Sequence, residues 1–275
     1  MSKKEKAGKV ILILLGVAFI FVMLVLPLIT VLIYALREGW RVFTAAVTDR
    51  YTVLALQLTL VATVSAVLFN TVFGLFSSWA ITKFRFRGKQ ILTTLIDIPF
   101  AISPVIAGLV FILVFGRIGW ANDFLQAHNI KIVFATPGII LATIFVTFPF
   151  ISKELIPLMQ SQGSDEEEAA ALAGAGAFTI FRKITLPHIK WALLYGIILC
   201  TARAMGEFGA VSVVSGHLRG KTNTLPLHVE ILFNEFHLTQ AFAVSSILVV
   251  LAIIILILKN IVEHKGRKEV DEVVR

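Results

Sequence analysis

The sequence is short of charged residues and holds a single cysteine. Asp, Glu, Lys and Arg make up 15% of its 275 residues, whereas a soluble domain has about 25%. One cysteine, Cys200, excludes an internal disulfide and any metal site built from several cysteines. In place of charge the chain has apolar residues, 57% of the total, in long uncharged runs. Such runs predict membrane spans, and Cys200 falls within one of them as a small packing residue.

The sequence also lacks the signatures of a nucleotide, zinc or nucleophile site. Gly220-Lys221-Thr222 resembles the end of a P-loop, but Ser215 stands where that pattern needs a glycine. The six histidines are scattered without the spacing of metal ligands. We therefore predict no catalytic residue, no metal and no cofactor in this chain, and no enzymatic activity of its own.

The apolar runs predict an all-α polytopic membrane protein with six spans. They are expected within residues 10–36, 51–82, 90–116, 132–152, 191–214 and 236–258. The first run is too long for the apolar part of a signal peptide and no cleavage site follows it, so we expect it to be retained, with a kink at Pro27. Residues 37–50 and 215–235 are expected to be polar connections. The chain then divides into a basic N-terminal segment (residues 1–9), a transmembrane domain (residues 10–258) and a charged tail (residues 259–275).

Positive charge is unevenly distributed over the connections. The N-terminal segment, residues 83–89, residues 153–190 and the tail hold 17 Lys and Arg, and the three connections on the other side hold 7. Because cytoplasmic segments are enriched in Lys and Arg, both termini and residues 153–190 are predicted to be cytoplasmic. The net charge of +8 lies beside the spans, which favours membrane lipid and not nucleic acid as its partner.

Two ionisable residues lie close together inside the fifth predicted span. Arg203 follows Lys190 by 13 residues, or about 20 Å of helix, which is near the middle of a bilayer. Glu207 is four residues further on and can pair with Arg203 on one helix face. Two interpretations stay open: the pair holds helices together, or Arg203 faces a pathway for an oxyanion and Glu207 weakens that attraction enough for release.

Asp97 is a third ionisable residue within a predicted span. It follows Lys89 by eight residues, so it is expected either near the cytoplasmic surface of the membrane or in an ion pair with Arg203. Pro99 and Pro104 would loosen the helix beside it. Small residues also recur at a spacing of four in the fifth span, which predicts close helix contact. These residues form two faces: Gly196, Cys200 and Ala204 on one, and Ala202, Gly206 and Ala210 on the other.

The longest charged, small-residue interruption of the apolar pattern is residues 164–187. Ser164 and Glu167 have the spacing of a capping box at the start of a helix. Gly174 permits a sharp bend at the end of that helix. Residues 177–184 are expected to form a second short helix that stops before Pro187. On composition alone this is either an ordinary loop helix or a surface that another protein approaches closely.

Seven residues of this interruption resemble the EAA loop of ABC-importer permeases at each fixed position of its pattern. They are Glu168, Ala169, Ala170, Gly174, Ile184, Leu186 and Pro187. The resemblance implies that residues 164–187, here called the EAA segment, contain a coupling helix that sits in a groove of a cytoplasmic ATPase.

Longer stretches resemble the CysW-type permeases of sulfate/thiosulfate ABC importers: residues 97–109, 203–216 and 225–230. The resemblance implies a type I, molybdate/sulfate-like permease fold in a bacterial inner membrane. It further implies a CysT-type sister permease or a second copy, two ATPase subunits that bind ATP, and a periplasmic sulfate/thiosulfate-binding protein. The expected pathway residues are Arg203, Glu207 and Asp97. Two alternatives stay open, a molybdate/tungstate permease and a secondary carrier or channel.

Overall fold

The computed structural model describes residues 3–273, with side chains from residue 8 to residue 266. The predicted basic segment and charged tail therefore lie partly outside the described residues. All regular structure in the described part is helical, which confirms the all-α prediction. The elements are α1 (Lys3–Ile20), η1 (Phe21–Val25), α2 (Leu26–Leu36), α3 (Trp40–Thr48), α4 (Arg50–Lys83), α5 (Lys89–Ala101), α6 (Pro104–Phe115), α7 (Asn122–Ala127), α8 (Thr136–Thr147), α9 (Pro149–Gln162), α10 (Asp165–Leu172), α11 (Ala177–Ile180), η2 (Phe181–Thr185), α12 (Leu186–Met205), α13 (Gly209–Ser215), α14 (Leu225–Asn234) and α15 (Leu238–Val273).

Five segments of the described chain are long and apolar enough to cross a membrane, and a bent pair of helices, taken as one span, is a sixth candidate. The five unbroken segments are Gly8–Leu36, Arg50–Lys83, Thr136–Gln162, Ala177–Met205 and Leu238–Gly266. The sixth is the pair α5 and α6, bent by 110°. The fourth span continues past its predicted end at Ser152, and the fifth ends at Met205 instead of near Val214.

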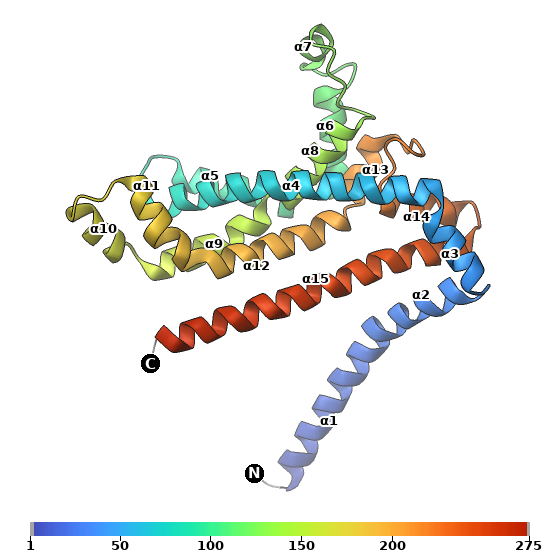
Figure 1. Ribbon diagram of the computed structural model, residues 1–275, viewed down its shortest axis with the longest axis horizontal. Helices are drawn as coiled ribbons and strands as arrows, with labels where there is room; N and C mark the ends of the chain where they lie inside the picture. Colours follow the sequence, from blue (N-terminus) through green and yellow to red (C-terminus); the bar gives the residue numbers. More distant parts are fainter. Residues whose placement is uncertain (1–2, 274–275) are drawn as a thin grey trace.

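The helices form an elongated bundle whose two ends differ (Figure 1). The long helices α4 and α15 run along it, with α10 and α11 at one end and α3 and α14 at the other. The segment from α6 through α7 to the start of α8 projects from its side. The first part of the first span, α1, stands away from the bundle, and its described side chains are exposed.

Two of the prolines follow a π-helical turn instead of ending a helix. The turn η1 precedes Leu26-Pro27, and η2 precedes Leu186-Pro187. A proline ring in an α-helix clashes with the carbonyl four residues earlier, and one extra residue in the turn moves that carbonyl away. The prediction of a helix that stops before Pro187 is therefore wrong, since α11, η2 and α12 form one span, Ala177–Met205.

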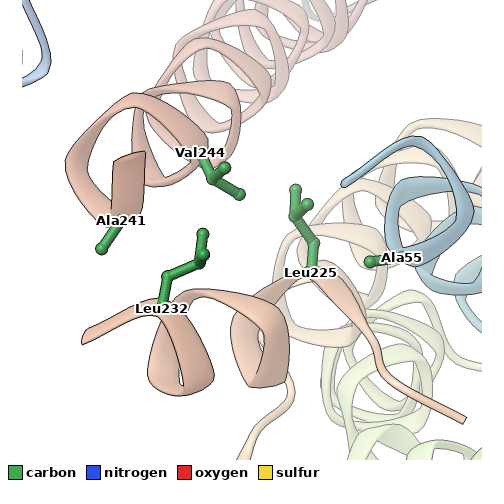
Figure 2. Close-up of a cluster of buried hydrophobic side chains, with 5 residues drawn as sticks. All are labelled: Ala55, Leu225, Leu232, Ala241 and Val244. Atoms are coloured by element: carbon green, nitrogen blue, oxygen red, sulfur yellow. The ribbon is translucent and has the colours of Figure 1, made fainter. Parts of the chain in front are cut away.

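The two connections expected to be polar loops contain helices. Asp49 caps α4 by accepting the amide N–H of Tyr51 at 2.8 Å, which separates α4 from the short helix α3. In the second connection, α14 lies between α4 and α15 with Leu225 and Leu227 fully buried. Figure 2 shows this packing through the side chains of Ala55, Leu225, Leu232, Ala241 and Val244.

Small and polar residues hold α4, α8, α9 and α12 together. The buried Asn70 amide on α4 donates to Thr147 Oγ1 at 2.8 Å and lies 3.8 Å from Cys200 Sγ. A Cβ at Gly196 would lie 3.2 Å from the Cα of Ile151, so these backbones approach closely. The predicted face of Gly196, Cys200 and Ala204 is buried. The second face does not form, because Met205 ends the helix before two of its members, Gly206 and Ala210.

Candidate functional site

Two helix breaks lie side by side within the bundle. The chain turns between α5 and α6 at Ile102-Ser103, and it leaves helix again at residues 206–208, between α12 and α13. A Cβ at Gly209 would lie 2.9 Å from Pro104 Cβ, so the second helix of each pair starts against the other. Figure 1 shows that α12 ends short of the bundle end occupied by α3 and α14. Irregular backbone at membrane depth is tolerated where protein covers it or where it lines a cavity.

Arg203 and Glu207 lie at the second break. Arg203 Nη1 is 2.5 Å from Glu207 Oε2, so the predicted pair is present although Glu207 lies beyond the end of α12. The other carboxylate oxygen of Glu207 accepts the amide N–H of Ala210 in the first turn of α13, at 2.9 Å. Glu207 is 2% exposed, whereas a third of the Arg203 side chain is exposed. Glu207 is therefore a fixed structural anchor, and Arg203 has surface left for another contact.

Asp97 does not form an ion pair with Arg203. Its carboxylate lies 2.7 Å from Lys153 Nζ, in an ion pair between α5 and α9 whose side chains are both about half exposed. Lys153 belongs to the part of the fourth span that continues past the predicted end, which explains why the sequence did not reveal this partner. The structure thus brings Arg203 and Glu207 together and places Asp97 in a different pair.

The EAA segment forms the predicted first helix and turn, its second helix continues into the fifth span, and its glycine has a definite conformational role. Gly174 follows α10 with a φ of 88°, a left-handed conformation that side chains disfavour. The amide of Gly174 donates to the carbonyl of Ala171, and the amide of Ala175 donates to that of Ala170, both at 3.0 Å. This pair of bonds is a Schellman motif, which ends a helix at a left-handed residue.

The predicted capping box at the start of α10 is wrong. Ser164 Oγ donates to Glu168 Oε1 at 2.5 Å, and its oxygen caps no amide of the helix. Glu167 does not turn back to Ser164 because its carboxylate has two partners elsewhere. Lys83 Nζ lies 2.8 Å from its Oε2, and Thr185 Oγ1 donates to its Oε1 at 2.6 Å. Sequence spacing did not predict these contacts, because Lys83 ends the second span and Thr185 lies 18 residues beyond Glu167.

The fixed positions of the EAA pattern are mostly turned outward. Glu168, Ala169, Gly174 and Pro187 are exposed, and Ala170 and Ile184 are half-buried. Leu186 packs against the buried cluster around Leu155 and Ile189. Next to these positions, the side chains of Leu172 and Phe178 are 91% and 73% exposed. These two side chains place exposed apolar area beside the fixed positions of the pattern.

A polar cavity of about 730 Å³ lies at the opposite end of the bundle, which the sequence did not reveal. Its lining includes Arg41, Asp49, Arg219, His228 and Glu235. Thr52 Oγ1 lies 3.2 Å from His228 Nε2. Burial, and secondarily the Arg219 guanidinium, lower the pKa of His228, so its imidazole is neutral at pH 7.

Residues 70–268, which contain both helix breaks and the whole EAA segment, match the family of inner membrane components of binding-protein-dependent transport systems. The chain belongs to this family. The transport subunit is 46% identical over 258 residues to the sulfate transport system permease protein CysW of Escherichia coli K12, covering 94% of this chain and 89% of that protein. It is 44% identical over 257 residues to CysW of Synechocystis, covering 94% and 93%.

The subunit also resembles a second kind of sulfate permease. It is 34% identical over 259 residues to the permease protein CysT of Salmonella typhimurium, covering 93% of this chain and 94% of that one. Among solved structures, a subunit of a bacterial alginate ABC transporter superposes with a TM-score of 0.78 at 17% identity, over 96% of both chains. The structural likeness confirms the expected ABC-transporter permease fold.

The pairing of Arg203 with Glu207 predicts a non-additive effect on stability. Arg203→Met leaves a buried carboxylate unpaired, so the free energy of unfolding should fall on the order of 3 kcal/mol. Adding Glu207→Gln removes the charge and keeps an acceptor for the Ala210 amide, so the double variant should regain most of the loss. Thermal unfolding in detergent measures both.

The matched control is Arg219→Met, since Arg219 pairs with Glu235 on an exposed surface. It should change stability by less than about 1 kcal/mol. A single Arg203 variant as stable as this control would show that the pair does not hold the second break together.

Proposed function

We propose that this subunit is the permease of an ATP-driven importer for sulfate and thiosulfate. The observation that carries the proposal is the 46% identity to a sulfate transport permease over 94% of the chain. The family match supports it further, because it spans both helix breaks and the EAA segment. The solute passes near the two breaks, and the energy comes from ATP bound by a separate ATPase.

The chemistry of the second break suits an oxyanion. An arginine guanidinium binds oxygen atoms of an anion through a planar fork of N–H groups. Glu207 occupies part of that fork, and the exposed third of Arg203 is free to bear on a passing solute. A pathway must bind weakly enough to release, and the paired carboxylate offsets part of the positive charge. Asp97 is also assigned to the pathway; it pairs with Lys153 and lies on α5, the first helix of the bent pair.

The EAA segment is the contact surface for the ATPase. Most of its charged and small residues are exposed, and Leu172 and Phe178 supply apolar area on either side of Gly174. The ATPase grips α10 as the coupling helix, and closure of the ATPase pair rocks the spans from inward-open to outward-open. Two ATPase subunits serve two permeases.

The remaining partners follow from the relatives and from charge. Relatives of two kinds, CysW and CysT, match this chain along most of its length, which supports a core of one permease of each kind. Both termini and the EAA segment face the cytoplasm, as the distribution of Lys and Arg predicts. The cavity near Arg219 then opens on the outer side, where a sulfate/thiosulfate-binding protein docks.

Uptake by the assembled complex tests the solute. Proteoliposomes that contain this subunit, its sister permease and the ATPase should take up labelled sulfate when ATP and the binding protein are supplied. Excess thiosulfate should compete with sulfate. Inhibition by molybdate and not by thiosulfate would favour a molybdate permease, and uptake by this chain alone without ATP would establish a carrier or channel.

A second experiment tests the role of Arg203 in transport. In the Glu207→Gln background, Arg203→Met should lower sulfate uptake about tenfold, the effect of losing one charge-assisted hydrogen bond. The single Glu207→Gln variant is the matched control. Because the double variant is expected to be stable, unchanged uptake would make the pair purely structural.

The left-handed glycine allows a sharp test of the EAA surface. Gly174→Pro cannot adopt a φ of 88° and loses the bond to Ala171, a change that costs about 3 kcal/mol locally. Uptake should fall at least tenfold while the spans still insert. Gly176→Pro is the matched control, because Gly176 already has a φ of −71°. Equal uptake by the two variants would count against the coupling role.

A further inference from the structure

The coupling helix α10 is poorly anchored by packing. None of its described residues is buried. Two cavities of about 500 and 420 Å³ flank it, and Lys83 and Glu167 line both of them. The helix therefore has cavities on both sides of its contact with the bundle, and Lys83 and Glu167 separate the two cavities.

The chain on each side of α10 is also permissive. Gly163 precedes the helix with a φ of 72°, and Gly174 follows it with a φ of 88°. Among the described residues, nothing lies within 4 Å of the place where a Cβ would be at either glycine. Glycine adopts many backbone conformations at little energetic penalty. The covalent connections alone thus leave the orientation of α10 weakly defined.

Polar contacts fix the orientation of α10 relative to the bundle. Lys83, the last residue of α4, donates to the carbonyl of Gly163 at 2.5 Å and pairs with Glu167 at 2.8 Å. Thr185 directly precedes α12 and is 3% exposed, and its hydroxyl donates to the same carboxylate at 2.6 Å. The side chains of Lys83 and Glu167 are 11% and 16% exposed, so water screens this pair less than a surface ion pair.

We propose that Lys83, Glu167 and Thr185 form a clamp that makes α10 move as one body with α4 and α12. The inference rests on the proposed function, because it assumes that an ATPase grips α10. The clamp also fixes the preceding hinge through the Gly163 carbonyl. Without it, a push on α10 rotates the helix about its two glycines instead of moving the spans.

The clamp connects α10 to α4, a long helix that can transmit this force along the bundle. The helix α4 has 34 residues, about 50 Å of continuous helix. At its other end Thr52 contacts His228, and Tyr51 lines the polar cavity of the opposite bundle end. A force that enters at Lys83 therefore reaches the far end without crossing a flexible connection.

The test is a double-mutant cycle in the assembled complex with its ATPase, read as solute imported per ATP hydrolysed. Lys83→Met and Glu167→Gln should each lower that ratio roughly fivefold, the low end for coupling between two sites. The double variant should be no worse than Lys83→Met, because each of the three variants already lacks the Lys83–Glu167 ion pair. ATP hydrolysis itself should continue, since this chain supplies no nucleotide site.

Lys83→Arg is the matched control for this ratio, because it keeps the charge and the donors, and it should stay near wild type. Glu166→Gln is the matched control for the isolated subunit, where no ATPase is bound. Glu166 lies one residue earlier on α10, its side chain is 71% exposed, and it lies 3.5 Å from His188. Additive losses, or a wild-type ratio in Lys83→Met, would overturn the clamp.

Hydrogen exchange in the isolated subunit gives a second readout that does not need transport. The amides of α10 should exchange faster in Lys83→Met than in wild type, with no such change in Glu166→Gln. Equal exchange in all three would also refute the proposal. If instead the wild-type complex imports nothing in the presence of ATP, or its ATPase contacts another surface, the proposed function fails and not the clamp.

Discussion

The constraint behind this structure is that a peptide group within a bilayer finds no water to bond. Every interruption of a helix must be satisfied by protein, and this chain interrupts two spans at the same place. The start of α6 covers the start of α13, and one buried carboxylate, Glu207, serves both the free amide of Ala210 and the guanidinium of Arg203. An ion pair and a break in the helix thus coincide at the end of α12, an arrangement that supplies both the charge and the movable backbone of the proposed solute path.

The sequence predicted features that depend on local composition. Long apolar runs placed six spans, the left-handed glycine placed the turn after α10, and the spacing of Arg203 and Glu207 predicted their pair. It failed where the outcome depends on distant residues. Ser164 and Glu167 have the spacing of a capping box, but Lys83 lies more than 80 positions earlier and competes for the same carboxylate. Asp97 pairs with Lys153 for the same reason, since no local pattern reports which helix will lie beside it.

The predicted polar loops failed for another reason. Residues 215–235 contain enough charge to resemble a solvated connection, yet Leu225 and Leu227 are fully buried within them. A helix of ten residues that folds back against α4 and α15 is too short to register as a span. His228 and Leu232 of this helix line the cavity near Arg219, and Leu225 and Leu227 are buried in the bundle. Composition averaged over the segment hides these buried leucines.

The π turns have a consequence for how this chain tolerates insertions and deletions. Each turn holds one residue more than an α-helix would use. Deleting a single residue between Phe181 and Thr185 would tighten η2 into ordinary α-helix. The EAA segment would keep its direction, because a π turn absorbs its extra residue without rotating the helix on either side, but the Pro187 ring would again clash with the carbonyl four residues earlier. Length, and not only identity, is therefore under constraint in this five-residue stretch.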